Sequence, residues 1–277
     1  MTLTGEASGL TAEMTGIELA RVREALALAL DVDDLASARA LASRLALYFG
    51  VVKIGLQLFV AAGPTAVEAL VSDGFPVFLD LKLHDIPNTV ARAAERARAI
   101  SATYLTVHAA GGETMLRAAV EAFGTPENRG TPENPGKAGT GGSPRNAGSR
   151  GTGGSAVTGG SPGRRGGILA VTVLTSEAHA PAAVVAERAE MAMRCGCVGV
   201  VCAASDLAIV REVAPELLAV VPGVRLAGSS ADDQARMATP GAATVAGAGL
   251  LVIGRTVSGA GDPEAAALRV AREVASV

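Results

Sequence analysis

Short apolar runs alternate with longer amphipathic segments through most of this 277-residue chain, and that alternation constrains the fold more than any other feature. Eight of the runs have the length and the branched apolar side chains of buried strands. We expect these strands at residues 25–31, 50–55, 76–82, 104–108, 168–174, 198–203, 217–221 and 250–253. Strict alternation of strands with helices implies parallel strands that are joined by helical crossovers.

A segment with helical periodicity follows each of these runs. We expect helices at residues 35–47, 64–71, 89–100, 113–123, 182–194, 206–213, 231–239 and 263–274. An open doubly wound sheet is one arrangement of eight such units, but a (β/α)8 TIM barrel fits the length better, since it typically takes about 250 residues. We therefore predict an α/β chain with a single TIM-barrel catalytic domain over residues 25–277 and an N-terminal extension at residues 1–24 that frays or caps the barrel.

Residues 124–166 differ from the rest because they are dense in Gly, Pro, Ser and Thr and nearly lack large apolar side chains. Such a segment cannot bury enough apolar surface to offset its ordering entropy. We predict a disordered loop, inserted after the fourth helix of the barrel. A tolerated surface insertion is the favoured interpretation, and the alternative is a basic tether that uses Arg129, Arg145, Arg150, Arg164 and Arg165.

The composition argues against several classes of function. A net charge of −3 at pH 7 argues against the basic face of a nucleic-acid binder, and an aromatic content of 3% leaves few side chains on which bases could stack. No apolar stretch is long enough to span a membrane, and the N-terminus carries Glu6 and Glu13 in place of a signal pattern, so we expect a cytoplasmic protein. Cys195, Cys197 and Cys202 are expected to be reduced residues in or beside a buried strand.

Charged side chains gather where the first three expected strands end. Asp31 ends the first strand, Lys53 lies near the end of the second, and Asp80 and Lys82 close the third. Functional residues of TIM barrels lie at these carboxyl ends, and alternation along the strand places Asp80 and Lys82 on one face. Asp85 follows just beyond. These side chains are predicted to form one charged rim.

The use of lysine supports a chemical role for this rim. The chain has 24 basic residues, of which only Lys53, Lys82 and Lys137 are lysines, and Lys137 falls in the 124–166 insertion. Lysine is a compact charge that can release a proton, whereas arginine is effectively never deprotonated. The alternative is that Lys53 and Lys82 are structural ion-pair partners of neighbouring aspartates, which the cost of burying charges disfavours.

A phosphate site is predicted across the barrel from this rim. The eighth strand runs into Gly254 and Arg255, and the seventh runs into a Pro-Gly-Val-Arg sequence that ends at Arg225. Loops after the seventh and eighth strands of TIM barrels frequently bind phosphate. Glycine allows the backbone to approach the ligand closely, and arginine binds phosphate oxygens in a bidentate manner.

The run DLKLHDIPNT at residues 80–89 resembles the signature of orotidine 5′-monophosphate decarboxylases. Further blocks resemble the same family and follow in its order, at residues 30–32, 52–55, 171–176, 222–225, 233–234 and 253–255. The N-terminal extension and the 124–166 insertion depart from the family pattern, but neither interrupts one of these motifs.

This resemblance implies a TIM barrel that converts orotidine 5′-monophosphate to UMP and CO2 in pyrimidine biosynthesis, without a cofactor or a metal. It implies four catalytic residues, with Lys82 as the proton donor to C6: Lys82, Asp80, Lys53 and Asp85. It implies that substrate is bound by Asp31, Lys53, Thr89, Thr175, Arg225, Gln234, Gly254 and Arg255. Asp31 and Lys53 would bind ribose, Thr175 the pyrimidine, and the last four residues the phosphate. It also implies a homodimer in which Asp85 and Thr89 reach the neighbouring subunit's site.

Other polar residues are given structural interpretations. We expect His84 to orient a neighbour, His108 to pack or to support a residue that contacts substrate, and Asp33 with Asp34 to cap a helix. Two other functions fit the sequence less well. A Mg²⁺-dependent sugar-phosphate decarboxylase needs free oxygen ligands, but the carboxylates here are interleaved with lysines. A nucleotide-binding barrel without activity would be expected to have lost Lys82 or Asp80, and both are present.

Overall fold

The computed structural model describes residues 14–124, 166–177, 180–226 and 238–277. Eight parallel strands form a closed barrel in which each strand pairs with the next and β8 pairs with β1. The strands are β1 (Leu26–Ala29), β2 (Val51–Ile54), β3 (Val77–Leu83), β4 (Tyr104–His108), β5 (Gly167–Val171), β6 (Gly199–Val201), β7 (Leu218–Val221) and β8 (Leu250–Ile253). This closed barrel confirms the predicted fold class.

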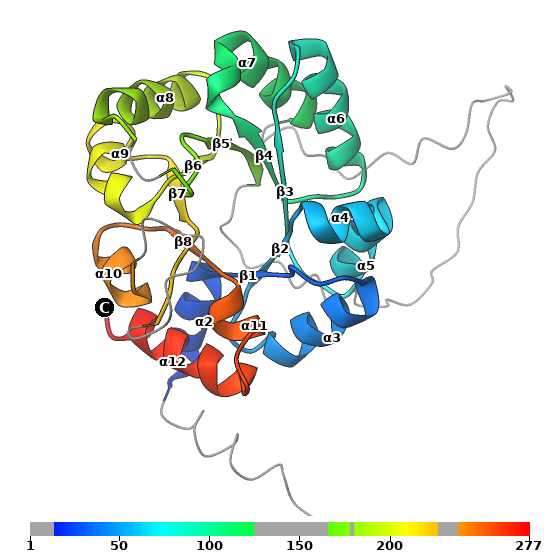
Figure 1. Ribbon diagram of the computed structural model, residues 1–277, viewed down its shortest axis with the longest axis vertical. Helices are drawn as coiled ribbons and strands as arrows, with labels where there is room; N and C mark the ends of the chain where they lie inside the picture. The colour runs from blue at the N-terminus through cyan, green and yellow to red at the C-terminus, as the bar shows by residue number, and fades with distance from the viewer. Residues whose placement is uncertain (1–13, 125–165, 178–179, 227–237) are drawn as a thin grey trace, which may run out of the picture.

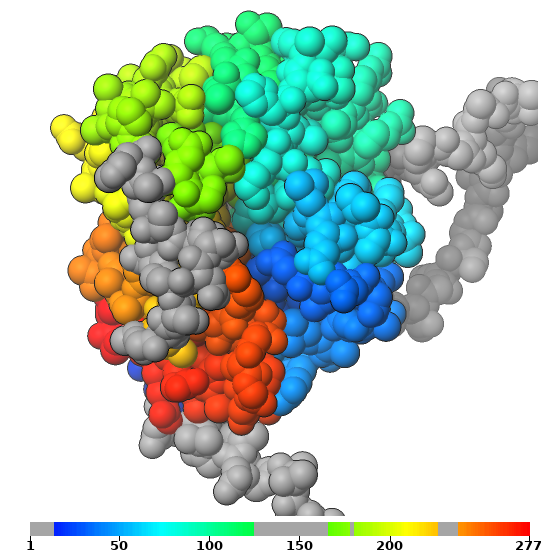
Figure 2. Space-filling view, viewed as in Figure 1, coloured from blue at the N-terminus to red at the C-terminus, as the bar shows by residue number. Residues whose placement is uncertain are grey.

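Helices surround the barrel, and successive strand–helix units follow one another around the ring (Figure 1). The main crossover helices are α3 (Leu35–Leu45), α5 (Pro64–Ser72), α6 (Pro87–Ala99), α7 (Gly112–Phe123), α8 (Ala182–Arg194), α9 (Leu207–Val213), α10 (Pro240–Val245) and α12 (Pro263–Ala275). In the space-filling view, the colour likewise runs around the molecule from blue to red (Figure 2). Residues adjacent in the chain therefore form adjacent sectors of the barrel.

Additional short elements belong to the carboxyl-end loops. Helix α4 (Leu56–Ala62) follows β2, and the single turn α11 (Arg255–Ser258) follows β8. Two 3₁₀ turns, η1 (Ala109–Gly111) and η3 (Ala204–Asp206), follow β4 and β6. The predicted insertion falls between α7 and β5, after the fourth unit as expected, but its residues 125–165 lie outside the described residues.

Part of the N-terminal extension forms a helix that the strand–helix pattern did not predict. Helix α2 (Gly16–Ala25) starts with a capping box, in which the Thr15 side chain and the Glu18 side chain each bond the other's backbone N–H. The helix buries Val22 and packs against α12 (Figure 1). Its last residue, Ala25, lies where the sequence predicts the start of the first strand, so that strand begins one residue later, at Leu26. The Thr-x-x-Glu spacing was a start signal available in the sequence.

The helix expected at residues 231–239 is wrong for the two residues that can be compared. Ala238 pairs with Val224 in an isolated β-bridge, and Thr239 is the N-cap of α10, where its hydroxyl accepts a hydrogen bond from the Ala242 N–H. Pro240 occupies the first helical position, which its fixed φ suits. Residues 231–237 lie outside the described part of the chain.

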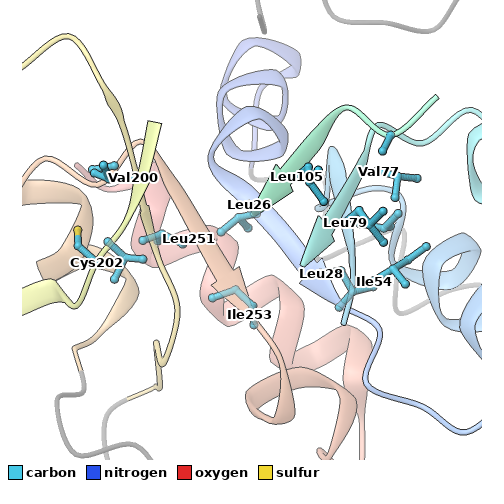
Figure 3. Close-up of a cluster of buried hydrophobic side chains, with 14 of the residues drawn as sticks. Leu26, Leu28, Ile54, Val77, Leu79, Leu105, Val200, Cys202, Leu251 and Ile253 are labelled. Carbon is cyan, nitrogen blue, oxygen red and sulfur yellow. The ribbon is translucent and has the colours of Figure 1, made fainter. Parts of the chain in front are cut away.

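Side-chain alternation along the strands divides the core into two layers. Inside the barrel lies a cluster that includes Ala27, Phe78, Tyr104, Val201 and Val252. A larger cluster lies between the strands and the helices. Figure 3 labels some of its members: Leu26, Leu28, Ile54, Val77, Leu79, Leu105, Val200, Cys202, Leu251 and Ile253. Fully burying a leucine contributes roughly 1.5–3 kcal/mol, so this layer makes the strands a rigid support for side chains at their ends.

Cys195, Cys197 and Cys202 are buried thiols, as predicted. Burial raises the pKa of the Cys197 thiol to about 12. Among the helices within the described ranges, none has the length and apolarity needed to cross a membrane.

Candidate active site

A cavity of about 300 Å³ opens at the carboxyl ends of the strands, a volume at the lower end of the range for small-molecule sites. Its floor is apolar and includes Ala29, Phe78, Val171, Val201 and Val252 from the barrel interior. Eight residues that the sequence predicted for the site line it: Asp31, Lys53, Asp80, Lys82, Thr175, Arg225, Gly254 and Arg255. The cavity therefore brings the charged rim and the expected phosphate loops into one site.

Four charged side chains form a connected network on one side of the cavity. Lys53 Nζ lies 3.0 Å from Asp31 Oδ1 and 3.9 Å from Asp80 Oδ2. Lys82 Nζ lies 2.7 Å from the same Asp80 oxygen. The charges thus alternate along the chain of contacts from Asp31 to Lys82, which places the Asp80 carboxylate between two ammonium groups.

The network is buried to different extents along its length. The side chains of Lys53 and Asp80 are only 10% and 12% exposed, whereas those of Lys82 and Asp31 are 35% and 50% exposed. A buried charge is tolerated when it is paired and hydrogen-bonded, and removing one partner of such a pair leaves the other uncompensated. Lys53 and Asp80 therefore form the buried, charge-compensated part of the network. The Lys82 ammonium is more exposed and is open to a ligand in the cavity.

An irregularity in β3 sets the direction of Lys82. Leu79 pairs with Leu105 and Leu83 pairs with Val107, so β3 has two residues more than β4 over this stretch. Lys82 has a φ of 49°, in the left-handed region. A non-glycine residue there costs about 1–3 kcal/mol and persists only where its surroundings impose it. Such bulges often re-aim a side chain beside an active site.

The loops after β7 and β8 line the cavity beside the charged network, and not across the barrel from it as predicted. The reason is that β8 pairs with β1, and a Cβ atom at Gly254 would lie 3.9 Å from Asp31 Oδ2. Gly254 and Arg255 lie at the start of α11, and Arg225 lies in the loop after β7. Thr256 ties the two loops together, because its hydroxyl donates to the Val224 carbonyl at 3.0 Å and lies 3.5 Å from Arg225 Nη1. Two guanidinium groups and a glycine backbone are chemically suited to a phosphate.

The loop after β5 contributes Leu174, Thr175 and Ser176 to the cavity. Arg188 on α8 donates from Nη1 to the carbonyl of Thr172 at 2.6 Å and so supports the start of this loop. Ser176 lies in a motif that the sequence singled out, but no role was predicted for it. A polar residue in a carboxyl-end loop was the signal that could have identified it.

Two of the predicted site residues, Asp85 and Thr89, do not line this cavity, and a third is not among the described residues. Asp85 and Thr89 are exposed at the loop before α6 and at the start of that helix, and Asp85 Oδ1 accepts a hydrogen bond from the Ile86 N–H. Gln234 lies outside the described residues. Asp85 therefore does not extend the Lys53–Asp80–Lys82 network within a single described chain.

His84 and His108 lie close to Lys82, and the Asp33–Asp34 pair follows β1. The rings of His84 and His108 have centroids 5.6 Å apart. Burial lowers the pKa of His108, and the nearby charges of His84 and Lys82 act in the same direction. Asp34 is the N-cap of α3 as predicted, but the interpretation of Asp33 as a cap is wrong: its carboxylate accepts a hydrogen bond from Gln57 on α4.

The fold and the cavity define the chain as a TIM-barrel protein with a lysine–aspartate cluster at the carboxyl ends of its strands. Residues 24–270 match the model of the Orotidine 5′-phosphate decarboxylase / HUMPS family. The chain belongs to this family, and it is an enzyme, a carboxy-lyase.

Relatives match over most of their own length. A protein of Anaeromyxobacter sp. (strain K) named orotidine 5′-phosphate decarboxylase is 43% identical, with 90% of this chain and 97% of the relative covered. One with the same name from Thermobifida fusca is 40% identical over 90% and 95%. The crystal structure of the decarboxylase from Lactobacillus acidophilus is similar at a TM-score of 0.65 and 28% identity, covering 91% and 99%.

Proposed function

We propose that this enzyme decarboxylates orotidine 5′-monophosphate to UMP and CO2 in pyrimidine biosynthesis. Family membership and the names of the relatives support the reaction. The observation that carries the mechanism is the contact of 2.7 Å between Lys82 Nζ and Asp80 Oδ2 at the wall of the cavity. This contact holds the positively charged Lys82 ammonium in a fixed position where a substrate in the cavity can reach it.

The chemistry requires such a charge. Loss of CO2 from C6 of the pyrimidine leaves an electron pair in the plane of the ring, where the π-system cannot delocalise it. Charge placed in advance where negative charge develops is often the largest catalytic contribution. In our proposal the Lys82 ammonium lies beside C6, stabilises the carbanion and then transfers a proton from Nζ to C6. The bond to CO2 breaks, and a C–H bond replaces it.

Asp80 is proposed to act in two ways. It holds the Lys82 ammonium by the ion pair described above, and it lies near the carboxylate that leaves as CO2. Two like charges about 4 Å apart repel by roughly 4 kcal/mol at an effective dielectric constant near 20, and departure of CO2 relieves that repulsion. Lys53 offsets the charge of Asp80 from the other side. We assign the ribose hydroxyls to Asp31 and Lys53, whose paired side chains line the cavity.

The remaining contacts are assigned by position. Thr175, after β5, is proposed to contact the pyrimidine. Gly254 and Arg255 are proposed to hold the 5′-phosphate with help from Arg225 and Gln234. Binding energy from a phosphate remote from C6 can organise the site around the reacting carbon. An Arg255→Ala variant is therefore expected to lose its preference for the nucleotide over orotidine, which lacks the phosphate.

We propose a homodimer in which Asp85 and Thr89 complete the site of the partner subunit. Both residues are exposed in the single chain and lie outside its cavity. Exposed apolar side chains lie nearby: Ile86, in the same loop after β3, is 65% exposed, and Leu56 and Val60 on α4, which follows the adjacent strand β2, are 57% and 83% exposed. Exposed apolar groups of this kind favour an interface.

We place the enzyme in the cytoplasm, where this pathway would supply its substrate.

A Mg²⁺-dependent sugar-phosphate decarboxylase is the alternative. Asp80 is the carboxylate deepest in the network, and both of its oxygens have partners: Oδ1 accepts from Thr106, and Oδ2 faces Lys82 and Lys53. A cation there would have to displace two ammonium groups. This arrangement favours the metal-independent reaction.

The test is the loss of orotidylate absorbance on addition of purified enzyme, with UMP and CO2 identified as products. We expect turnover that continues in the presence of EDTA. Absence of turnover, with the nucleotide bound, would indicate a binding protein. Activity that EDTA abolishes and Mg²⁺ restores would support the alternative reaction.

A further inference from the structure

Thr106 is a buried polar residue inside the barrel, directly beneath the charged network. It lies in the middle of β4 with an exposure of 0%, between the inward-facing residues Tyr104 and His108. Its hydroxyl makes two hydrogen bonds to the neighbouring strand β3. Oγ1 accepts from the Lys82 backbone N–H at 2.8 Å and donates to Asp80 Oδ1 at 2.9 Å. One hydroxyl group thus contacts both residues of the ion pair that faces the cavity.

The irregularity in β3 explains why a side chain is needed at this point. Between the Leu79–Leu105 and Leu83–Val107 pairs, the two additional residues of β3 interrupt the regular ladder. The N–H of Lys82 is bonded by the Thr106 hydroxyl, a side-chain acceptor on the adjacent strand. A backbone N–H that is buried without an acceptor is costly. The hydroxyl therefore stabilises Lys82 in its left-handed conformation, with its φ of 49°.

The directions of the two hydrogen bonds are fixed by their chemistry. A backbone N–H can only donate, so the hydroxyl oxygen is the acceptor and its own hydrogen points to Asp80. This hydrogen occupies Oδ1 of the carboxylate and leaves Oδ2 for the ammonium groups, at 2.7 Å from Lys82 and 3.9 Å from Lys53. The rotation of the Asp80 carboxylate, and with it the place of the Lys82 ammonium, depends on Thr106.

We propose that Thr106 is a positioning residue for decarboxylation: its hydroxyl sets both the backbone of Lys82 and the carboxylate of Asp80, and so fixes the ammonium group against C6. Thr106 does not line the cavity, so its effect on the reaction passes through these two residues. The inference rests on the proposed function. A displacement of about 1 Å in a catalytic group can lower the rate by roughly a hundredfold.

Three substitutions separate the hydroxyl from the volume of the side chain. Thr106→Val keeps the shape and removes both hydrogen bonds, Thr106→Ser keeps the hydroxyl and removes a methyl group, and Thr106→Cys offers only a weak donor and a weak acceptor. We expect kcat to fall at least about tenfold in Thr106→Val, with KM changed much less, because an interaction that matters in the transition state is lost. Thr106→Ser should stay near the wild type, and Thr106→Cys should fall between them.

Thr103 provides a matched control at the other end of the same two strands. Its Oγ1 accepts a hydrogen bond from the Val77 N–H at 3.2 Å, at the start of β3 and away from the charged network. Thr103→Val removes a comparable contact between a threonine hydroxyl and the β3 backbone. It should change the thermal midpoint of unfolding and leave kcat of the folded enzyme unchanged.

The outcomes distinguish the two levels of the proposal. If the wild type does not turn over orotidine 5′-monophosphate, the proposed function fails. If the wild type is active and folded Thr106→Val retains its kcat, positioning by Thr106 is refuted. The same conclusion follows if Thr106→Ser loses as much activity as Thr106→Val, since volume would then decide. Should Thr106→Val not fold, the comparison of Thr106→Cys with Thr106→Ser decides: equal kcat values would refute the role.

Discussion

Gly55 lies directly against Lys53: a Cβ atom at position 55 would be 2.9 Å from Lys53 Nζ and 3.1 Å from Asp31 Oδ1. The glycine that precedes α4 thereby makes room for the ion pair to which we assign the ribose hydroxyls. The φ of Gly55 is −90°, so its role comes from space and not from backbone conformation.

A Gly55→Ala substitution is expected to disturb substrate binding more than folding. The added methyl group pushes the flexible end of Lys53 away, which costs little stability but separates Lys53 from Asp31. We expect KM for orotidine 5′-monophosphate to rise by about tenfold or more, or about 1.4 kcal/mol. Gly16→Ala is the control, because a Cβ there meets nothing within 4 Å. An unchanged KM in Gly55→Ala would contradict the ribose assignment.

The shared site can be tested with mixed subunits. Lys82→Ala and Asp85→Ala should each be inactive as homodimers. When the two variants are mixed and allowed to exchange, half of the dimers are mixed, and each has one site with both native residues. Activity should recover to about a quarter of the wild type if the dimer is isologous and each site draws Asp85 from the partner. No recovery, despite subunit exchange detected by native mass spectrometry, would show that Asp85 serves its own chain.

His108 should make stability depend on pH. Burial lowers the pKa of His108 below its ordinary value of 6.5, so the unfolded chain binds a proton at a pH where the folded chain does not. Where the unfolded state binds more protons, stability increases with pH. This residue's contribution is therefore present above the unfolded value and is lost as pH falls through 6.5 toward the lowered pKa.

The measurement is denaturant unfolding of the wild type and His108→Gln at about pH 5 and about pH 7.5. The substitution removes the titrating group, so it should destabilise the protein less at the lower pH than at the higher one. Equal destabilisation at both values would contradict the assignment of a lowered pKa to His108.

The cysteines should resist modification while the protein is folded. Burial raises the pKa of Cys197 to about 12 and also raises that of Cys195, and the thiolate is the reactive form. Alkylation by iodoacetamide at about pH 8, followed by mass spectrometry, should label neither thiol until denaturant is added. Rapid labelling of Cys197 in the native enzyme would show that this part of the barrel opens.

The barrel could be predicted from the sequence because two independent periodicities agree. Apolar runs alternate with helical segments, and the parity within β3 separates Phe78, Asp80 and Lys82, which line the cavity, from Leu79, which packs between strands and helices. Because parallel strands end at one edge, charges at the ends of strands had to meet, and the predicted residues of three neighbouring strands line one cavity. The residue types at the strand ends therefore predicted the site wherever the order of the strands brought those ends together.

What could not be predicted depends on irregular backbone. The role proposed for Thr106 follows from the extra residues of β3. Position 82 is left-handed but is a lysine, so no glycine in the sequence indicates that conformation. Ala238 forms a β-bridge with Val224, a pairing between residues distant in the sequence that helical periodicity cannot anticipate. Helix α2 could have been found from its Thr15–Glu18 spacing, but an expected strand at residue 25 obscured its end.

The most direct test of the account is single-turnover decarboxylation by Lys82→Ala, with binding of UMP measured on the same preparation. We expect the rate to fall by at least about a thousandfold, as for loss of a general acid that also stabilises charge, while UMP is still bound through its phosphate. A variant that binds UMP and decarboxylates within about tenfold of the wild-type rate would contradict the central role of the Lys82 ammonium.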